Sequence, residues 1–228
     1  MHTFFEVLEM LGIVSFAVSG AMVAIDKQTD AFGVLFLAVT TTFGGGMTRD
    51  LLIGNIPPLF FSNGVGILVC LSVALTVFLL AAVFKKHYIA KEKLIYTVNN
   101  VFDAIGLGVF AVMGAQIALE SPDAVVSHPA CAIFCGMIST IGGSIIRDVL
   151  LRDIPFIFCK RIYALAALTG ASVYVLLVSV GADSVAAATV SVVTVFALRM
   201  MATAFKWNIP PAIRFDRCDT PSDHLSNK

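Results

Sequence analysis

The chain has 228 residues, of which 58% are hydrophobic and only 13% are charged. A soluble domain of this length could not bury so much apolar surface, so the composition indicates an integral membrane protein. The formal net charge is zero, which gives no support to nucleic-acid binding and leaves membrane lipid, sister subunits and a small solute as the expected partners.

Seven apolar segments, separated by short polar breaks, approach the roughly 20 residues that a helix needs to cross a bilayer. The predicted fold class is therefore an all-α integral membrane protein with one seven-helix transmembrane domain over residues 1–205. The first segment follows no basic stretch and precedes no small-residue cleavage site, so it is expected to remain as a spanning helix. The predicted spans are residues 5–25, 31–53, 64–84, 98–119, 128–151, 162–180 and 184–205.

Basic residues are confined to alternate breaks between the spans. Because lysine and arginine near span ends are retained on the cytoplasmic side, this pattern predicts an outside N-terminus and a cytoplasmic C-terminus. The polar segment 206–228 is expected to be a disordered cytoplasmic tail. The basic residues on the predicted cytoplasmic side are Lys27, Lys85, Lys86, Lys91, Lys93, Arg152, Lys160, Arg161, Lys206, Arg214 and Arg217.

One motif occurs twice, in the second and fifth spans. Residues 43–57 read FGGGMTRDLLIGNIP, and residues 141–155 read IGGSIIRDVLLRDIP. The similarity extends to the first and fourth spans, where residues 11–24 match residues 105–118 at seven positions. Glycine clusters and charged pairs are both costly inside a membrane, so their presence at matched places indicates a functional role.

The duplication divides the domain into two repeats and one additional helix. Repeat 1 covers about residues 5–84, repeat 2 covers about residues 98–180, and the additional helix covers about residues 184–205. Because each repeat has three spans, the copies must cross the membrane in opposite directions. The sequence therefore predicts an inverted repeat with a pseudo-twofold axis in the membrane plane.

The glycine clusters of the two motifs predict a kink or a short unwound stretch in the second and fifth spans. Residues with little or no side chain permit non-helical torsions, and broken backbone at membrane depth is tolerated only where protein or water covers it. Freed carbonyls would suit a cation, and half-helix N-termini would suit a carboxylate. The alternative is close helix packing. The candidate pore or kink residues are Gly44, Gly45, Gly46, Gly142, Gly143 and Ser144.

An arginine and an aspartate follow each glycine cluster by about one helical turn: Arg49 and Asp50, then Arg147 and Asp148. Adjacent residues do not face each other on a helix, so each charge is expected to pair with another helix. In one interpretation the arginines extend to the membrane interfaces and brace the helix ends. In the other, the charges line the vestibules of a polar path.

Other polar residues inside the spans extend this candidate path. Asp103 lies near the predicted cytoplasmic basic loop and is expected to pair there, as a vestibule or bracing charge. Hydroxyl groups commonly return a hydrogen bond to their own helix, which is the alternative to a pore-lining role. The candidate pore-lining hydroxyls are Ser15, Ser19, Thr41, Thr42, Ser139 and Thr140.

No arrangement of residues indicates catalysis, a metal site or a cofactor. The sequence has no HExxH motif, no P-loop and no glycine-rich dinucleotide motif after a strand. The five cysteines include no CxxC pair and lie mostly in apolar segments, so they are interpreted as small core residues.

The chain resembles a prokaryotic member of the trimeric intracellular cation (TRIC) channel family. The resemblance rests on the doubled motif, on the order of the spans (two three-span repeats followed by one additional span) and on the chain length. The resemblance covers nearly the whole chain to about residue 205. It implies a homotrimer in the bacterial inner membrane, with a water-filled potassium or monovalent cation pore in each protomer, shaped by the kinks of the second and fifth spans.

The same bacterial family is associated with glycine transport. An inverted repeat with two broken helices is also the common plan of secondary transporters, so a carrier for glycine or a similar amino acid is the alternative. A structural or assembly membrane protein is a third class, which polar groups at membrane depth disfavour.

Overall fold

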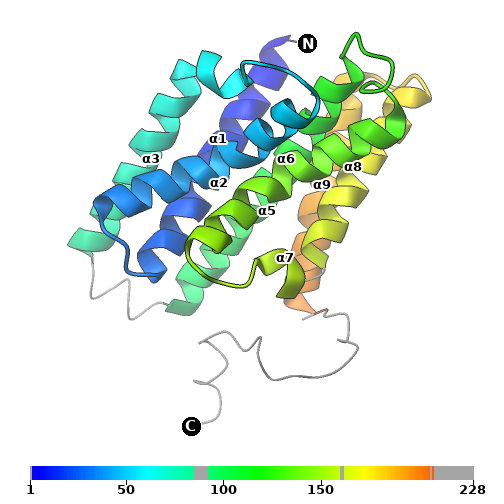
Figure 1. Ribbon diagram of the computed structural model, residues 1–228. Coiled ribbons are helices and arrows are strands. Elements are labelled where there is room, and N and C mark those ends of the chain that lie inside the picture. The colour runs from blue at the N-terminus through cyan, green and yellow to red at the C-terminus, as the bar shows by residue number, and fades with distance from the viewer. Residues whose placement is uncertain (1, 85–91, 160–161, 206, 208–228) are drawn as a thin grey trace.

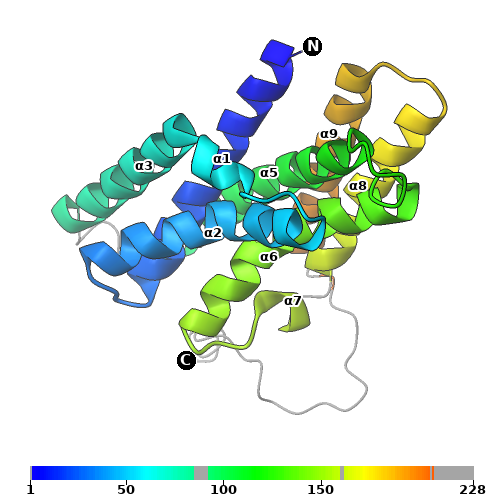
Figure 2. The ribbon, with the colours of Figure 1, turned by 45° about the horizontal axis from the view of Figure 1, so that its top comes forward.

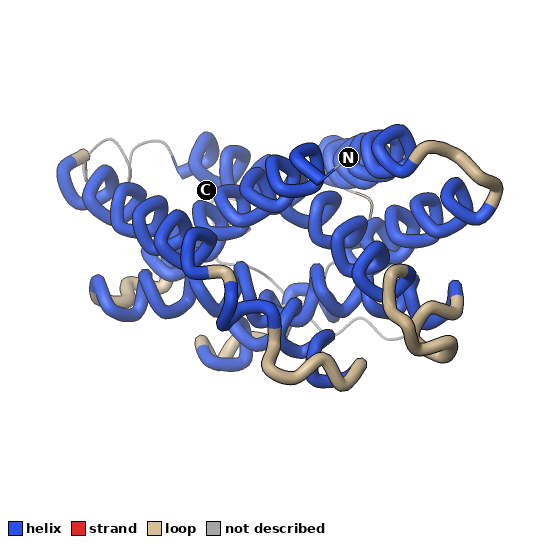
Figure 3. The backbone as a smooth tube through the Cα atoms, turned by 90° about the horizontal axis from the view of Figure 1, so that it is seen from above, coloured by secondary structure: helices blue, strands red, loops and turns tan. Residues whose placement is uncertain are grey.

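The computed structural model describes residues 2–84, 92–159, 162–205 and 207, and every element within them is helical (Figure 3). Seven of these helices are long and apolar enough to cross a membrane, which confirms the predicted fold class. Apart from residue 207, the predicted tail lies outside the described residues. The spanning helices are α1 (His2–Asp26), α2 (Ala31–Leu52), α3 (Gly64–Val83), α5 (Glu92–Leu119), α6 (Pro129–Leu150), α8 (Ile162–Ser179) and α9 (Ser184–Ala204).

Helices α1, α2, α5 and α6 form the centre of the bundle. Helix α3 packs against α1 and α2 on one flank, whereas α8 packs against α5 and α6 on the other (Figures 1 and 2). Across the centre, α1 contacts α5 and α2 contacts α6. Each central helix therefore contacts its own equivalent, as a pseudo-twofold axis between the repeats requires.

Small residues let these central helices approach closely. A Cβ atom on Gly12 of α1 would lie 2.7 Å from the Cγ1 atom of Val109 on α5, and one on Gly106 of α5 would overlap the Phe16 ring on α1. Because Gly12 and Gly106 occupy equivalent positions, the same packing device serves both repeats.

Helices α2 and α6 end in the same way. Gly54 and Arg152, at equivalent positions, both have a left-handed backbone, with φ of +73° and +59°. In each case the next amide donates back to the helix: Asn55 N to Asp50 O at 2.8 Å, and Asp153 N to Asp148 O at 2.9 Å. This geometry satisfies carbonyls that a helix end would leave unpaired.

Two short helices that the sequence did not predict follow these ends. The 3₁₀-helix η1 covers Leu59–Ser62, and α7 covers Phe156–Cys159. Their first residues lie within one position of equivalence in the two repeats. The inverted repeat thus extends from the spanning helices into the connecting segments.

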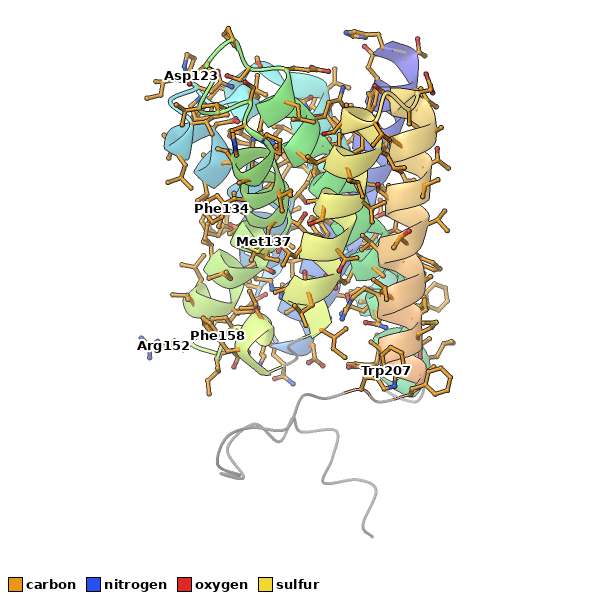
Figure 4. The ribbon with its side chains drawn as sticks, turned by 90° about the vertical axis from the view of Figure 1, so that its right-hand side faces the viewer. Asp123, Phe134, Met137, Arg152, Phe158 and Trp207 are labelled. Atoms are coloured by element: carbon orange, nitrogen blue, oxygen red, sulfur yellow. The ribbon has the colours of Figure 1, made fainter. Side chains whose placement is uncertain are left out.

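The described loops divide between the two ends of the bundle as the seven spans predict. Figure 4 shows Asp123, between α5 and α6, at one end and Arg152 and Trp207 at the other. Lys27, between α1 and α2, forms a 2.6 Å ion pair with Asp153, which follows α6. Basic residues of two separate loops therefore lie at the same end.

Candidate functional site

The two glycine motifs meet where α2 crosses α6. A Cβ atom on Gly44 would lie 3.1 Å from the Cα atom of Gly143, and one on Gly142 would lie 2.9 Å from the Cα atom of Gly45. Gly44 is equivalent to Gly142, and Gly45 to Gly143, so the pseudo-twofold axis relates the two contacts. The motifs are therefore in direct backbone contact.

The approach is closest at one glycine of each motif. A Cβ atom on Gly45 would overlap the carbonyl group of Ser139, and a Cβ atom on Gly143 would overlap that of Thr41. Any side chain at these two positions would push the helices apart, so the crossing requires glycine.

Both helices remain helical throughout the glycine clusters. The short unwound stretch that the sequence suggested is therefore absent, and the close-packing alternative describes the glycines in this structure. The physical reason is that two glycine surfaces can bury each other's backbone without breaking either helix. Bending at these positions stays a prediction.

The arginine and aspartate after each glycine cluster pair with each other. Arg49 donates to Oδ1 of Asp50 from Nε at 2.9 Å and from Nη2 at 2.6 Å. Arg147 donates to Oδ1 of Asp148 in the same way, at 2.9 and 2.7 Å. The expectation that each charge pairs only with another helix was wrong, because a long arginine side chain can fold back along the helix surface.

These charges are also buried. Arg49 is 5% exposed and Arg147 is 6% exposed, and each lies in the last turn of its helix. Asp50 accepts a further hydrogen bond at its Oδ2 atom from the amide of Leu59, at 2.8 Å. The pair in α2 thus anchors the segment that leads to η1.

Arg49 also links the two repeats. Its Nη1 atom donates to the hydroxyl of Ser139 on α6 at 3.3 Å, and Ser139 donates to the carbonyl of Cys135 at 2.6 Å. Ser139 was a candidate pore-lining hydroxyl, and the structure places it beside a buried guanidinium.

The remaining candidate hydroxyls are buried, and three of them donate to their own helix. Thr41 bonds to Leu37 O at 2.6 Å, and Thr42 bonds to Ala38 O at 2.8 Å. Thr140 bonds to Gly136 O at 3.0 Å. The donors of these residues are therefore satisfied locally, as the alternative interpretation expected. Ser15 and Ser19 lie buried on α1, and the Ser15 hydroxyl has no partner among the described atoms.

Asp103 on α5 pairs with residues inside the bundle. Its Oδ2 atom lies 3.0 Å from Nη2 of Arg199 on α9, and its Oδ1 atom accepts from the Tyr163 hydroxyl at 3.3 Å. Arg199 also donates to Oδ1 of Asn100 at 3.0 Å, and its guanidinium lies 4.7 Å from the centre of the Tyr163 ring. The residues of the loop at 85–91 lie outside the described residues.

Arg199 was not among the candidate residues predicted from the sequence. The signal was present, since Arg199 is a lone arginine within an apolar span, and such residues are rare unless they are paired. Its partner could not be identified from sequence, because α9 has no counterpart in the repeat from which a contact could be transferred.

Comparison with known proteins supports these observations. A family model described as glycine transporter matches residues 6–82 and 100–179, which correspond closely to the two repeats. The structure resembles that of the trimeric intracellular cation channel orthologue from Rhodobacter sphaeroides, with 32% sequence identity and a TM-score of 0.78, over 90% of this chain and 100% of that one. The chain belongs to the TRIC family.

Two relatives show how the family is distributed. A membrane protein of Deinococcus radiodurans assigned to UPF0126 is 37% identical over 166 residues, which cover 72% of each chain. An Escherichia coli protein, the UPF0126 inner membrane protein YadS, is 34% identical over 167 residues, or 73% of this chain and 75% of that one. With its seven apolar helices, this TRIC family member is a multi-pass membrane protein.

Proposed function

We propose that the protein is a homotrimeric channel for potassium and other monovalent cations, with a water-filled path in each protomer. The observation that carries this proposal is the similarity, over nearly the whole chain, to a solved trimeric cation channel. Three buried ion pairs among the described spanning helices support it, because charges at membrane depth are otherwise costly.

We place the path beside the crossing of α2 and α6. The glycines there fill the contact between the helices, so a column of ions has no room between them. We propose that opening requires the two helices to bend or slide at this side-chain-free contact. Arg49 and Arg147 lie on the same two helices, together with four of the candidate pore hydroxyls: Thr41, Thr42, Ser139 and Thr140.

Planar bilayer recording tests the channel. Purified protein under a potassium chloride gradient should give unitary current steps that reverse near the potassium equilibrium potential. Heat-denatured protein at the same concentration is the control. Steps that reverse at the chloride potential, or no steps from folded protein, would reject cation conduction.

A glycine carrier is the second candidate, and the description of the matching family model favours it. An inverted repeat can move a solute by rocking one half against the other. Liposomes loaded with unlabelled glycine should then accumulate labelled glycine by counterflow, and this uptake should saturate. A channel would show neither saturation nor counterflow.

We also propose an outside N-terminus and a cytoplasmic C-terminus in the bacterial inner membrane. The ion pair between Lys27 and Asp153 supports the grouping of the basic loops at one end, and the positive-inside rule assigns that end to the cytoplasm. A fluorescent reporter at the C-terminus should fluoresce, whereas a periplasmic phosphatase fused there should be inactive. Cross-linking in native membranes should give a trimer.

A further inference from the structure

Each repeat carries a carboxylate at the same position of its first helix. Glu9 on α1 aligns with Asp103 on α5 when residues 11–24 are matched to residues 105–118. Each carboxylate accepts a hydrogen bond from the beginning of the third helix of its own repeat. The donor to Glu9 is Asn63 Nδ2 at 2.8 Å, before α3, and the donor to Asp103 is the hydroxyl of Tyr163, in α8.

The two carboxylates differ in their basic partners. Asp103 pairs with Arg199, and the two side chains are only 11% and 5% exposed. Glu9 is half-buried and has no ion pair among the described residues. Arg49 is close enough to act on Glu9 electrostatically, but its ion pair is with Asp50.

The difference arises from α9, the additional helix that follows the two repeats and has no equivalent in either. Helix α9 packs against α5 and α8, and its backbone at Val192 lies 3.1 Å from the position of a Cβ atom on Gly108. No described helix occupies the corresponding place beside α1 and α3. Helix α9 therefore brings one positive charge to the second repeat alone.

This charge changes the balance between the two ends of the bundle. Of the charges at matched positions of the two repeats, Glu9, Arg49 and Asp50 sum to one negative charge near the end of α1 where Asn63 lies. The corresponding residues of the second repeat, Asp103, Arg147 and Asp148, would leave the same charge at the opposite end. Arg199 cancels it.

We propose that Arg199 is a built-in counter-cation, which occupies Asp103 and keeps permeating cations from binding to that carboxylate. The proposal rests on the proposed cation conduction. It makes the path asymmetric, with a carboxylate available to cations near Glu9 and none available near Asp103.

The geometry of Arg199 favours a charge role over a purely structural one. The buried Nε atom of Arg199 has no hydrogen-bond partner among the described atoms, and an unsatisfied buried donor is destabilising. The hydrogen bonds of Arg199 to Asp103 and to Asn100 both come from its Nη2 atom.

The test measures whether K⁺ can replace the guanidinium. The thermal unfolding midpoint of purified R199Q would be followed at constant ionic strength, with KCl exchanged for N-methylglucamine chloride. Vacating Asp103 should create a K⁺ site, so the midpoint of R199Q should rise with K⁺ by about 2–4 °C more than that of the wild type. Wild type provides the baseline, which includes any K⁺ binding near Glu9.

The matched control is the double variant D103N/R199Q, which lacks both charges and should return to the wild-type K⁺ response. R199K, which retains a positive charge, should also behave as wild type. If the unfolding midpoints of R199Q and D103N/R199Q respond equally to K⁺, the proposal is rejected and Arg199 has only a structural role. If R199Q folds only when K⁺ is present, the proposal is supported. If R199Q does not fold even in K⁺ while D103N/R199Q does fold, the proposal is rejected.

Conduction gives a second measurement. With all channels inserted in one orientation and at low salt, wild type should pass unequal currents at opposite voltages, because the negative charge near Glu9 has no counterpart near Asp103 among the matched charges of the two repeats. R199Q should pass more nearly equal currents. If no variant conducts, the proposed channel function fails, whereas the K⁺-dependent midpoint still tests the site at Asp103.

Discussion

The rings of Phe16 and Phe110 stack with centroids 5.1 Å apart and planes 28° apart, although 94 positions separate them in the chain. Phe16 lies on α1, and Phe110 is its equivalent on α5. Two equivalent residues that contact each other must lie at the pseudo-twofold axis. The stacked pair thus lies at the contact between α1 and α5, where the two inverted halves meet. The glycine crossing lies at a second such contact, between α2 and α6.

Removing either ring should destabilise the junction between the repeats. In a bilayer the unfolded helices already lie in an apolar solvent, so mainly packing is lost, and F16A should cost about 1–3 kcal/mol. A double-mutant cycle with F110A should give a coupling of about 0.5–1.5 kcal/mol, measured by unfolding in mixed micelles. F134A, on the exposed face of α6, is the control. Additive effects of F16A and F110A would contradict the stacking interaction.

The glycine crossing predicts a sharp contrast between neighbouring positions. G45A and G143A should each force α2 and α6 apart, lower the free energy of unfolding by about 2–3 kcal/mol, and abolish K⁺ flux into liposomes. The Cβ atom would overlap backbone carbonyl groups, which cannot move aside.

Gly46 provides the matched control within the same cluster. A Cβ atom there would come no closer than 3.8 Å to Nη2 of Arg49, and the equivalent residue in repeat 2 is Ser144. G46A should therefore be neutral, or stabilising by about 0.5–1 kcal/mol through helix propensity. If G45A is as harmless as G46A, the close crossing is not required.

The buried ion pair in α2 predicts that single neutralisation is worse than double neutralisation. R49Q should destabilise by about 3–5 kcal/mol, because it leaves the carboxylate of Asp50 buried without a counter-charge. R49Q/D50N should recover much of this loss, although Leu59 then keeps a weaker acceptor. Thermal unfolding of the purified variants measures the difference.

The exposed pair formed by Lys27 and Asp153 is the comparison for these buried charges. Its side chains are 37% and 41% exposed, and K27Q should change the free energy of unfolding by less than about 1 kcal/mol. Equal effects of R49Q and K27Q would show that burial does not determine the cost.

The ends of α2 and α6 predict a stabilising substitution. Arg152 has a left-handed backbone, whereas the equivalent residue in repeat 1 is Gly54, which adopts this conformation freely. R152G should raise the free energy of unfolding by about 1 kcal/mol. G54A is the reverse control and should lower it by a similar amount. A decrease in stability for R152G would mean that the arginine side chain makes a contact worth more than the strain.

The sequence by itself determined the seven spans and the inverted repeat. These features follow from local composition and from symmetry: about 20 apolar residues must cross the bilayer, and three-span repeats must be antiparallel.

Only the tertiary structure decided how the polar residues use that arrangement. The periodicity of a helix gives the direction of a Cβ atom but not the path of a long side chain, so the pairing of Arg49 with Asp50 was missed. The glycines pack against each other while both helices stay intact, because each helix covers the backbone of the other. The partner of Asp103 is Arg199 on α9, a helix outside the repeat, and only the folded bundle could place it there.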